Sequence, residues 1–263
     1  MIESLFKSIP TSFEIKERNG VYSFLTAANC KRLNVFNETL LAWRKKRGEI
    51  ERLPYEKLPY LKTSFWQSRQ FDLEIIQQNL PNKSCKILEL GAWNGWLAYN
   101  LSKEHEVIAI DYFDDSVDGL GAIQSYPKNS IVAIQMLPLD IGYLKPDFDV
   151  IIFNRNLSYL PDYTEILSQA KTLLKASGKL VITGIHIHQN KPELREMKDL
   201  KLFFQDKNVS FPFENGFKEY LDRSDLQFLK DEGIQLIPYP KSLKQRISAT
   251  FKPTSVQSFI GIL

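Results

Sequence analysis

The segment Ile87–Trp96 constrains the fold more than any other part of this sequence. A short apolar run that contains one acid, Glu89, leads into a turn with Gly91 and Gly95, and a helical pattern follows the turn. A strand that enters a helix through a glycine-bearing turn directs backbone N–H groups and the positive end of the helix dipole at one place. The segment therefore predicts an α/β fold with a ligand site at this turn.

Apolar runs and helical patterns alternate along the chain from residue 86 onward. The strand-like runs are Lys86–Leu90, Val107–Asp111, Ile131–Met136, Phe148–Asn154 and Lys179–Ile185, and helical patterns lie at Trp96–Lys103, Leu120–Ser125, Tyr163–Leu174, Pro192–Lys207 and Ser224–Glu232. Continuous apolar strands with intervening helices are typical of a parallel sheet covered on both faces. Two later runs, Ile234–Tyr239 and Ser255–Leu263, have only a loop between them, so we expect them to pair antiparallel.

The first sixty residues have a different pattern. Asn19-Gly20 between Phe13–Arg18 and Val21–Leu25 predicts a β-hairpin, in which Ile15 faces Phe24 and Phe13 faces Thr26. Thr26 is a suitable cap for a helix that ends at Arg44–Arg47, and Ser64 for a second helix that ends before Pro81. Pro54 and Pro59 mark residues 48–61 as a linker, so we divide the chain into an N-terminal extension, 1–62, and a main domain, 63–263.

The composition is that of a soluble globular protein. Hydrophobic residues make up 43% and charged residues 25%, and the net charge is only +3, too small to indicate nucleic acid by itself. Cys30 and Cys85 are too few for a disulfide framework, and with three histidines in the chain we expect no metal site. The apolar runs are too short to span a membrane, and the N-terminus shows no signal pattern, so we expect a cytoplasmic protein.

The glycine turn does not fit a dinucleotide. A G-x-G-x-x-G fingerprint requires small residues where Trp93 and Trp96 stand, and the charge of Glu89 would repel a pyrophosphate. The same acid suits a ligand with an ammonium or sulfonium group. A nicotinamide-dependent oxidoreductase is therefore the weakest of the possible functions.

The stretch Glu89-Leu90-Gly91-Ala92-Trp93-Asn94-Gly95 resembles the first motif of class I S-adenosylmethionine-dependent methyltransferases. Further resemblance extends over the main domain and is closest to the ubiquinone/menaquinone-methyltransferase-like group. The segments that carry it are Trp66-x-x-Arg69, Asp118-Gly119-Leu120-Gly121-Ala122 and Asn154-Arg155-Asn156-Leu157-Ser158-Tyr159. The resemblance implies a Rossmann-like, doubly wound sheet of seven strands, mostly parallel, with an antiparallel C-terminal strand.

The resemblance also implies a set of residues that bind S-adenosylmethionine. Those expected at the methionine end and along the turn are Arg69, Glu89, Gly91, Ala92, Trp93, Asn94, Gly95 and Asn154. Asp111, about twenty positions after Glu89, would hold the ribose hydroxyls. Tyr112 would pack on the adenine ring, and Asp140 with Ile141 would meet the adenine edge. An alternative for the Trp66–Arg69 pair is a core tryptophan and a solvated arginine.

Candidate catalytic residues lie after the fourth and fifth strands. Tyr159 follows the fourth strand, where the methyl acceptor is expected. His186 and His188 follow the fifth strand and share one face, so either is a candidate general base; alternatively, both are hydrogen-bonded loop residues. We expect methyl transfer to the O, N or C atom of a small molecule, with the N-terminal extension as a cap.

Two rival functions remain open. Basic residues at 44–52 and at 241–252 fit phosphates, as a tRNA or rRNA methyltransferase would require. The other rival is an S-adenosylmethionine-binding protein without catalysis. The sequence gives no information on the oligomeric state.

Overall fold

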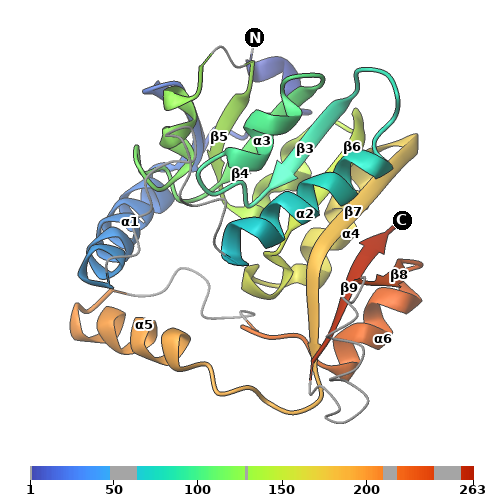
Figure 1. Cartoon of the computed structure of the whole chain (residues 1–263). Helices are drawn as coiled ribbons and strands as arrows, with labels where there is room; N and C mark the ends of the chain where they lie inside the picture. Colours follow the sequence, from blue (N-terminus) through green and yellow to red (C-terminus); the bar gives the residue numbers. More distant parts are fainter. Residues whose placement is uncertain (1, 48–63, 128–129, 210–217, 240–255) are drawn as a thin grey trace.

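The computed structural model describes residues 2–47, 64–127, 130–209, 218–239 and 256–263. A mixed sheet occupies the centre, and helices cover both of its faces (Figure 1). The strands are β1 (Phe13–Arg18), β2 (Val21–Thr26), β3 (Lys86–Leu90), β4 (Glu106–Asp111), β5 (Val132–Met136), β6 (Phe148–Asn154), β7 (Leu174–His188), β8 (Gln235–Pro238) and β9 (Val256–Ile262). The helices are α1 (Ala27–Arg47), α2 (Ser64–Asn79), α3 (Trp96–Leu101), α4 (Tyr163–Leu173), α5 (Arg195–Asp206) and α6 (Arg223–Asp231). Short 3-10 turns are η1 (Ile2–Leu5), η3 (Leu120–Ser125), η4 (Pro138–Tyr143) and η5 (Leu157–Tyr159).

The strand order confirms the predicted topology. Across the described residues the order is β1-β2-β5-β4-β3-β6-β7-β9-β8, and the strands from β5 to β7 are all parallel to their neighbours. β9 runs antiparallel between β7 and β8, as the C-terminal sequence pattern indicated. The seven strands β3 to β9 are therefore the expected Rossmann-like sheet, and the N-terminal hairpin adds two more.

The hairpin is part of the same sheet. Ile15 pairs with Phe24 and Phe13 with Thr26, as predicted, and β2 then pairs parallel with β5 through Val21 and Ala133. The sequence pattern predicted the hairpin but not this second pairing. The strand with which the hairpin pairs depends on which edge of the sheet has apolar residues that the apolar face of the hairpin can cover. Phe24 is fully buried there, and its ring stacks on the ring of Phe13 at 4.6 Å.

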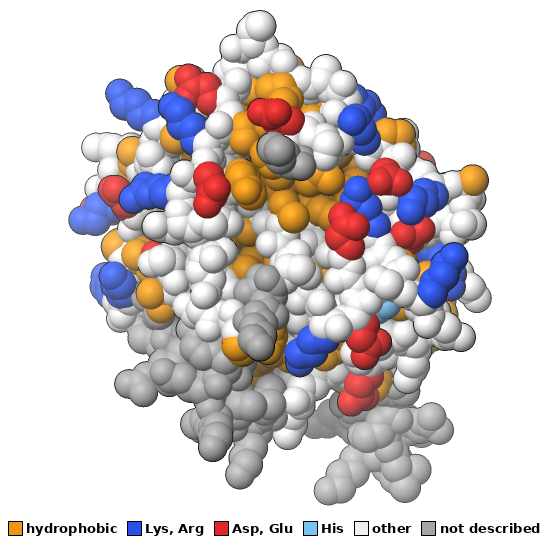
Figure 2. Space-filling model, turned by 90° about the horizontal axis from the view of Figure 1, so that it is seen from above, with side chains coloured by type: hydrophobic (Ala, Val, Ile, Leu, Met, Phe, Trp, Pro, Cys, Tyr) orange, Lys and Arg blue, Asp and Glu red, His pale blue; other side chains and the backbone are white. Residues whose placement is uncertain are grey.

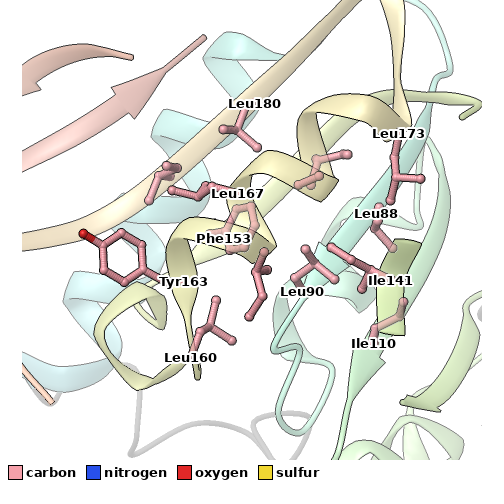
Figure 3. Packing of buried hydrophobic residues seen from close by; sticks show 14 of the residues in the cluster. Leu88, Leu90, Ile110, Ile141, Phe153, Leu160, Tyr163, Leu167, Leu173 and Leu180 are labelled. Carbon is pink, nitrogen blue, oxygen red and sulfur yellow. The ribbon is translucent and has the colours of Figure 1, made fainter. Parts of the chain in front are cut away.

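Alternate residues of each strand face two separate hydrophobic cores, as expected for a sheet covered on both sides. On one face, Leu88 and Leu90 of β3 and Phe153 of β6 pack against α4, where Leu167 and Leu173 are fully buried (Figure 3). On the other face, Ile87 and its neighbours pack against α2, α3 and η3. Both cores support the turn between β3 and α3.

Helices α1 and α5 lie side by side outside these two cores (Figure 1). They share an apolar cluster with Phe36 and Trp43 from α1 and Leu200 and Phe204 from α5, and Tyr112, after β4, packs against it. We refer to these two helices as the α1–α5 cover. The Thr26 side chain accepts a hydrogen bond from the Asn29 N–H at 3.2 Å, which is the predicted N-cap of α1.

Some predictions fall on residues that the structure does not describe, namely the linker at 48–61 and the basic segment 241–252. The described helices include none with both the length and the apolar run that crossing a bilayer requires. On the face seen from above, basic and acidic side chains alternate around a hydrophobic area, without a field of one sign (Figure 2).

Candidate functional site

A pocket of about 650 Å³ opens at the carboxyl ends of β3 and β6. Its lining consists of Arg44, Arg69, Glu89, Gly91, Ala92, Trp93, Asn94, Trp96, Leu97, Asn154, Arg155, Asn156, Tyr159 and Glu196. The volume lies in the range of small-molecule sites. The carboxyl edge of a parallel sheet is also where ligands bind in open α/β folds. Five of the seven residues of the predicted glycine motif are in this lining, namely Glu89, Gly91, Ala92, Trp93 and Asn94, whereas Leu90 and Gly95 are not.

The glycine turn requires glycine at two positions. Gly91 has φ of +72°, and a Cβ there would lie 2.1 Å from the amide nitrogen of Asn156. Gly95 has φ of +73°, and its Cβ would lie 2.1 Å from Ile123. Any side chain at either position would therefore combine an unfavourable backbone with a steric clash.

Asp111 holds the turn from the end of β4. Its carboxylate accepts the backbone N–H of Trp93 at 2.7 Å and that of Phe113 at 3.0 Å. Burial raises the pKa of Asp111, and the backbone N–H groups oppose that effect. Each carboxylate oxygen has the capacity to accept a second hydrogen bond, but Asp111 is largely buried and is not in the lining of the pocket.

Glu89 presents an unsatisfied acceptor to the pocket. The side chain is 2% exposed, and its Oε2 has no hydrogen-bond partner within the described parts of the chain. Burial and, secondarily, the charge of Asp111 raise the pKa of Glu89 well above its usual value, whereas the Ala98 N–H lowers it. A second buried acceptor without a described partner, the Oδ1 of Asn156, belongs to the same lining. Two such acceptors fit a ligand that brings N–H donors and positive charge.

Trp93 occupies the position where related motifs often have glycine, and its φ is +50°. Its ring stacks on Trp66 with 6.3 Å between centroids, and the guanidinium groups of Arg69 and Arg44 lie 5.3 and 5.8 Å from its centre. Trp66 is fully buried, whereas Arg69 lines the pocket. Trp66 is therefore a core residue, as the second alternative for this pair expected. Arg69, in contrast, lines the pocket, as the first alternative expected.

The residues predicted for the adenine are not in the lining of the pocket. Tyr112 packs against Phe36 of the α1–α5 cover, with 5.6 Å between the ring centres. Burial raises the pKa of Asp140 to about 6, and its Oδ2 has no hydrogen-bond partner in the described regions. Ile141 is fully buried in the core. The structure thus brings most residues predicted for the methionine end together in one pocket and leaves Tyr112, Asp140 and Ile141 outside its lining.

The predicted catalytic residues separate into two groups. Tyr159 lines the pocket, and burial together with Glu196 and Glu219 raises the pKa of its hydroxyl. His186 and His188 are the last residues of β7 on one face, but neither is in the described lining. The His186 Nδ1 lies 2.9 Å from the Ser258 hydroxyl, and burial lowers the pKa of the ring.

Six residues of the lining were not among the predicted site residues: Arg44, Trp96, Leu97, Arg155, Asn156 and Glu196. Arg155 and Asn156 stand in a segment already noted for its resemblance, so that segment was a usable signal. Glu196, from α5, had no signal, because its approach to the site depends on how the α1–α5 cover packs. Across the described residues there is no group of three or more acidic, histidine or cysteine side chains that could hold a metal.

Comparison with known proteins agrees with the fold. Residues 88–180 match the family model described as "Methyltransferase domain", a range that runs from β3 into β7. The chain is 26% identical over 168 residues to the highly reducing polyketide synthase Preu5 of Preussia isomera. It is 23% identical over 219 residues to the tRNA U34 carboxymethyltransferase of Ruthia magnifica subsp. Calyptogena magnifica.

Both curated relatives are longer than the part that matches. The alignment covers 54% of this chain but 6% of the polyketide synthase, and 80% of this chain but 63% of the tRNA-modifying protein. Among solved structures, the CurJ carbon methyltransferase has a TM-score of 0.52 with 16% identity and covers 87% of this chain and 70% of its own. At this identity the likeness concerns the fold alone. Residues 88–180 are therefore similar to a methyltransferase domain, and the chain has the fold of class I S-adenosylmethionine-dependent methyltransferases.

Proposed function

We propose that this chain binds S-adenosylmethionine at the pocket and transfers its methyl group to a small-molecule acceptor. The observation that carries the proposal is that two buried acceptors without a partner among the described residues, on Glu89 and Asn156, share one lining with the guanidinium of Arg69. The α-amino acid end of the cofactor has an ammonium group, which Glu89 and Asn156 can bind, and a carboxylate, which Arg69 can bind. When bound, the cofactor supplies a methyl group that its positive sulfur activates for transfer.

The residues around the pocket have separate roles in this proposal. Glu89 and Asn156 bind the ammonium group, and Arg69 binds the carboxylate. Asp111 accepts hydrogen bonds from the ribose while it fixes the Trp93 backbone. Tyr112 packs on the adenine, and Asp140 accepts from the adenine amino group.

Methyl transfer by displacement needs alignment of the acceptor more than it needs acid–base chemistry. Tyr159 is half exposed at the pocket, and its raised pKa keeps the hydroxyl protonated at neutral pH. We therefore assign Tyr159 to orienting the acceptor by donating a hydrogen bond. His186 and His188 remain candidates for a general base. Because neither is in the described lining, an acceptor that gives up a proton to one of them would have to extend beyond the pocket.

The finer assignments rest on the same resemblance. We propose membership of the ubiquinone/menaquinone-methyltransferase-like group and a cytoplasmic location. We also propose that the N-terminal extension acts as a cap, because Arg44 of α1 contributes to the pocket and pairs with the buried carboxylate of Asp118.

Calorimetric titration with S-adenosylmethionine tests the proposal. The Asp111→Asn variant should bind about tenfold more weakly, since it loses a charged acceptor worth roughly 1.5 kcal/mol. Asp149→Asn is the matched control, because Asp149 also accepts a backbone N–H, from Lys86 at 2.8 Å, at the opposite edge of the sheet. Equal affinities for the two variants would contradict the assignment of Asp111.

A tRNA acceptor is the second candidate, and the name of the tRNA-modifying relative favours it. A labelled-methyl assay on total tRNA and on a small-molecule extract distinguishes the two acceptors. Binding to RNA should weaken steeply with salt, by about 0.7 log units per log unit of salt for each single-strand phosphate contact. Label in RNA would replace our proposal with the RNA candidate, and cofactor binding without any label would support the non-catalytic one.

A further inference from the structure

Arg155, the first residue after β6, has a backbone conformation that is unfavourable for arginine. Its φ is +58°, in the left-handed region that favours glycine. The structure around it must therefore stabilise this conformation. The residue lines the proposed cofactor pocket, so the inference below rests on the proposed function.

The guanidinium of Arg155 binds a carboxylate in the protein interior. Its Nε and Nη2 donate to the two oxygens of Asp72, on α2, and the Asp72 side chain is fully buried. A buried carboxylate that lost this partner would keep an uncompensated charge, so the pair strongly favours one position of Arg155.

Tyr239, the residue after β8, also holds Asp72 in place. Its hydroxyl donates to the Oδ1 of Asp72 at 2.6 Å and accepts the backbone N–H of Gly184 at 2.8 Å. Gly184 has φ of +66°, and a Cβ there would lie 2.4 Å from the Arg155 side chain. The glycine thus allows β7 to approach Arg155 closely.

The backbone of the same segment is fixed as well. The Arg155 N–H donates to the Thr183 carbonyl at 3.1 Å, and the Thr183 hydroxyl donates to the Asn154 Oδ1 at 2.7 Å. On the other side, the Asn156 amide donates to the Leu90 carbonyl, directly over Gly91. The three residues Asn154–Asn156 are therefore held from α2, β3, β7 and β8 at once.

All three residues line the pocket, and Asn156 supplies one of its unsatisfied acceptors. We propose that Asp72 and Tyr239 are positioning residues, which hold Arg155 so that Asn154 and Asn156 meet the amino-acid end of the cofactor. Neither Asp72 nor Tyr239 is in the lining, so both act through Arg155.

The test compares two ligands that differ in the amino-acid end. S-adenosylhomocysteine carries that end, and 5′-methylthioadenosine lacks it. The Tyr239→Phe variant, titrated with each ligand by calorimetry, should bind S-adenosylhomocysteine about fivefold more weakly. Its affinity for 5′-methylthioadenosine should stay within about twofold of wild type, since that ligand does not contact the segment.

Tyr163→Phe is the matched control. The Tyr163 hydroxyl also donates to a buried carboxylate at 2.6 Å, that of Asp225, but neither residue lines the pocket. It should lower the melting temperature while leaving both affinities unchanged. Asp72→Asn keeps the shape of Asp72 and should repeat the selective loss more strongly, whereas Arg155→Lys should retain part of the affinity for S-adenosylhomocysteine.

Three results would overturn the proposal. In the first, Tyr239→Phe binds S-adenosylhomocysteine as wild type does. In the second, it loses affinity for both ligands in equal proportion, which is the result of a purely structural role. In the third, the wild-type protein binds neither ligand; the proposed function then fails, and this inference fails with it.

Discussion

The two halves of the carboxyl edge of the sheet are built in different ways. Over β3 and β6 the edge is open and polar, and buried acceptors on Glu89 and Asn156 face a pocket of about 650 Å³. Over β4 and β5 the edge lies against the α1–α5 cover, where Tyr112 and Leu137 pack beside apolar side chains of both helices. Most of the lining of the open half comes from residues 88–180, which match the methyltransferase family model, whereas both helices of the cover come from outside that range.

We expect the open half and the cover to have different roles in the proposed function. Under the proposed function, the strand ends and the glycine turn select the cofactor, and the backbone geometry at Gly91 and Gly95 tolerates few substitutions. Under the proposed function, the cover surrounds the adenosine half and, through Arg44 and Glu196, selects which acceptors reach the pocket. Variants in the open half should therefore change cofactor affinity more than variants in the cover.

The largest effect is expected for Gly91→Ala. Alanine is strained in the left-handed backbone conformation of Gly91, and its Cβ would push the Asn156 side chain away from the Leu90 carbonyl. The two effects together should cost about 2–4 kcal/mol of free energy. Calorimetry should show S-adenosylmethionine affinity reduced about a hundredfold. Gly233→Ala is the control: its φ is +81°, but the nearest atom to its Cβ is 3.4 Å away and the residue is outside the pocket lining. If both variants bind alike, the turn is not the cofactor site.

A smaller, pH-dependent effect is expected at Asp140. Burial raises the pKa of this carboxyl to about 6, so it is charged at pH 7.5 and mostly protonated at pH 5. An adenine amino group donates best to the charged form, so the affinity for S-adenosylhomocysteine should fall about fivefold as the pH falls between these values. Asp140→Asn should show the lower affinity throughout and a flatter profile. A wild-type affinity independent of pH would contradict the role of Asp140.

The smallest effect on affinity is expected for Phe204→Ala, in the cover. Loss of this buried ring costs about 3–5 kcal/mol of local packing, yet cofactor affinity should fall only about two- to threefold. Hydrogen exchange should accelerate in α1 and α5 and remain slow in β4 and β5. Leu202→Ala, an exposed position of the same helix, should change neither quantity. If Phe204→Ala weakened cofactor binding more than Gly91→Ala does, the distinction between the open half and the cover would be wrong.

The sheet could be predicted from the sequence because its strands are defined by local patterns. β3 and β6 have the predicted bounds, and the register of the hairpin follows from Asn19-Gly20. The pairing of β2 with β5 has no local signature, because it depends on which sheet edge remains uncovered.

The residues of the site also divide into those that a local sequence pattern identifies and those that only the fold brings together. Glu89, Gly91 and Trp93 were identifiable because they belong to one contiguous motif. Asp72 and Tyr239 were not, because each meets Arg155 only through folding, and a lone buried Asp or Tyr has no sequence signature. Glu196 was missed for the same reason.

The parallel pairing of β2 with β5 also affects the order of folding during synthesis. Val21 leaves the ribosome about 110 residues before its partner Ala133, which corresponds to roughly 5–20 seconds at ordinary rates of synthesis. In that interval Phe24 has no strand to cover it, and the hairpin alone is only marginally stable. Pairing over such a long stretch of chain is intrinsically slow, so closing this edge should be a late step in folding. The nascent chain is thus exposed to aggregation through its first strands until β5 has emerged.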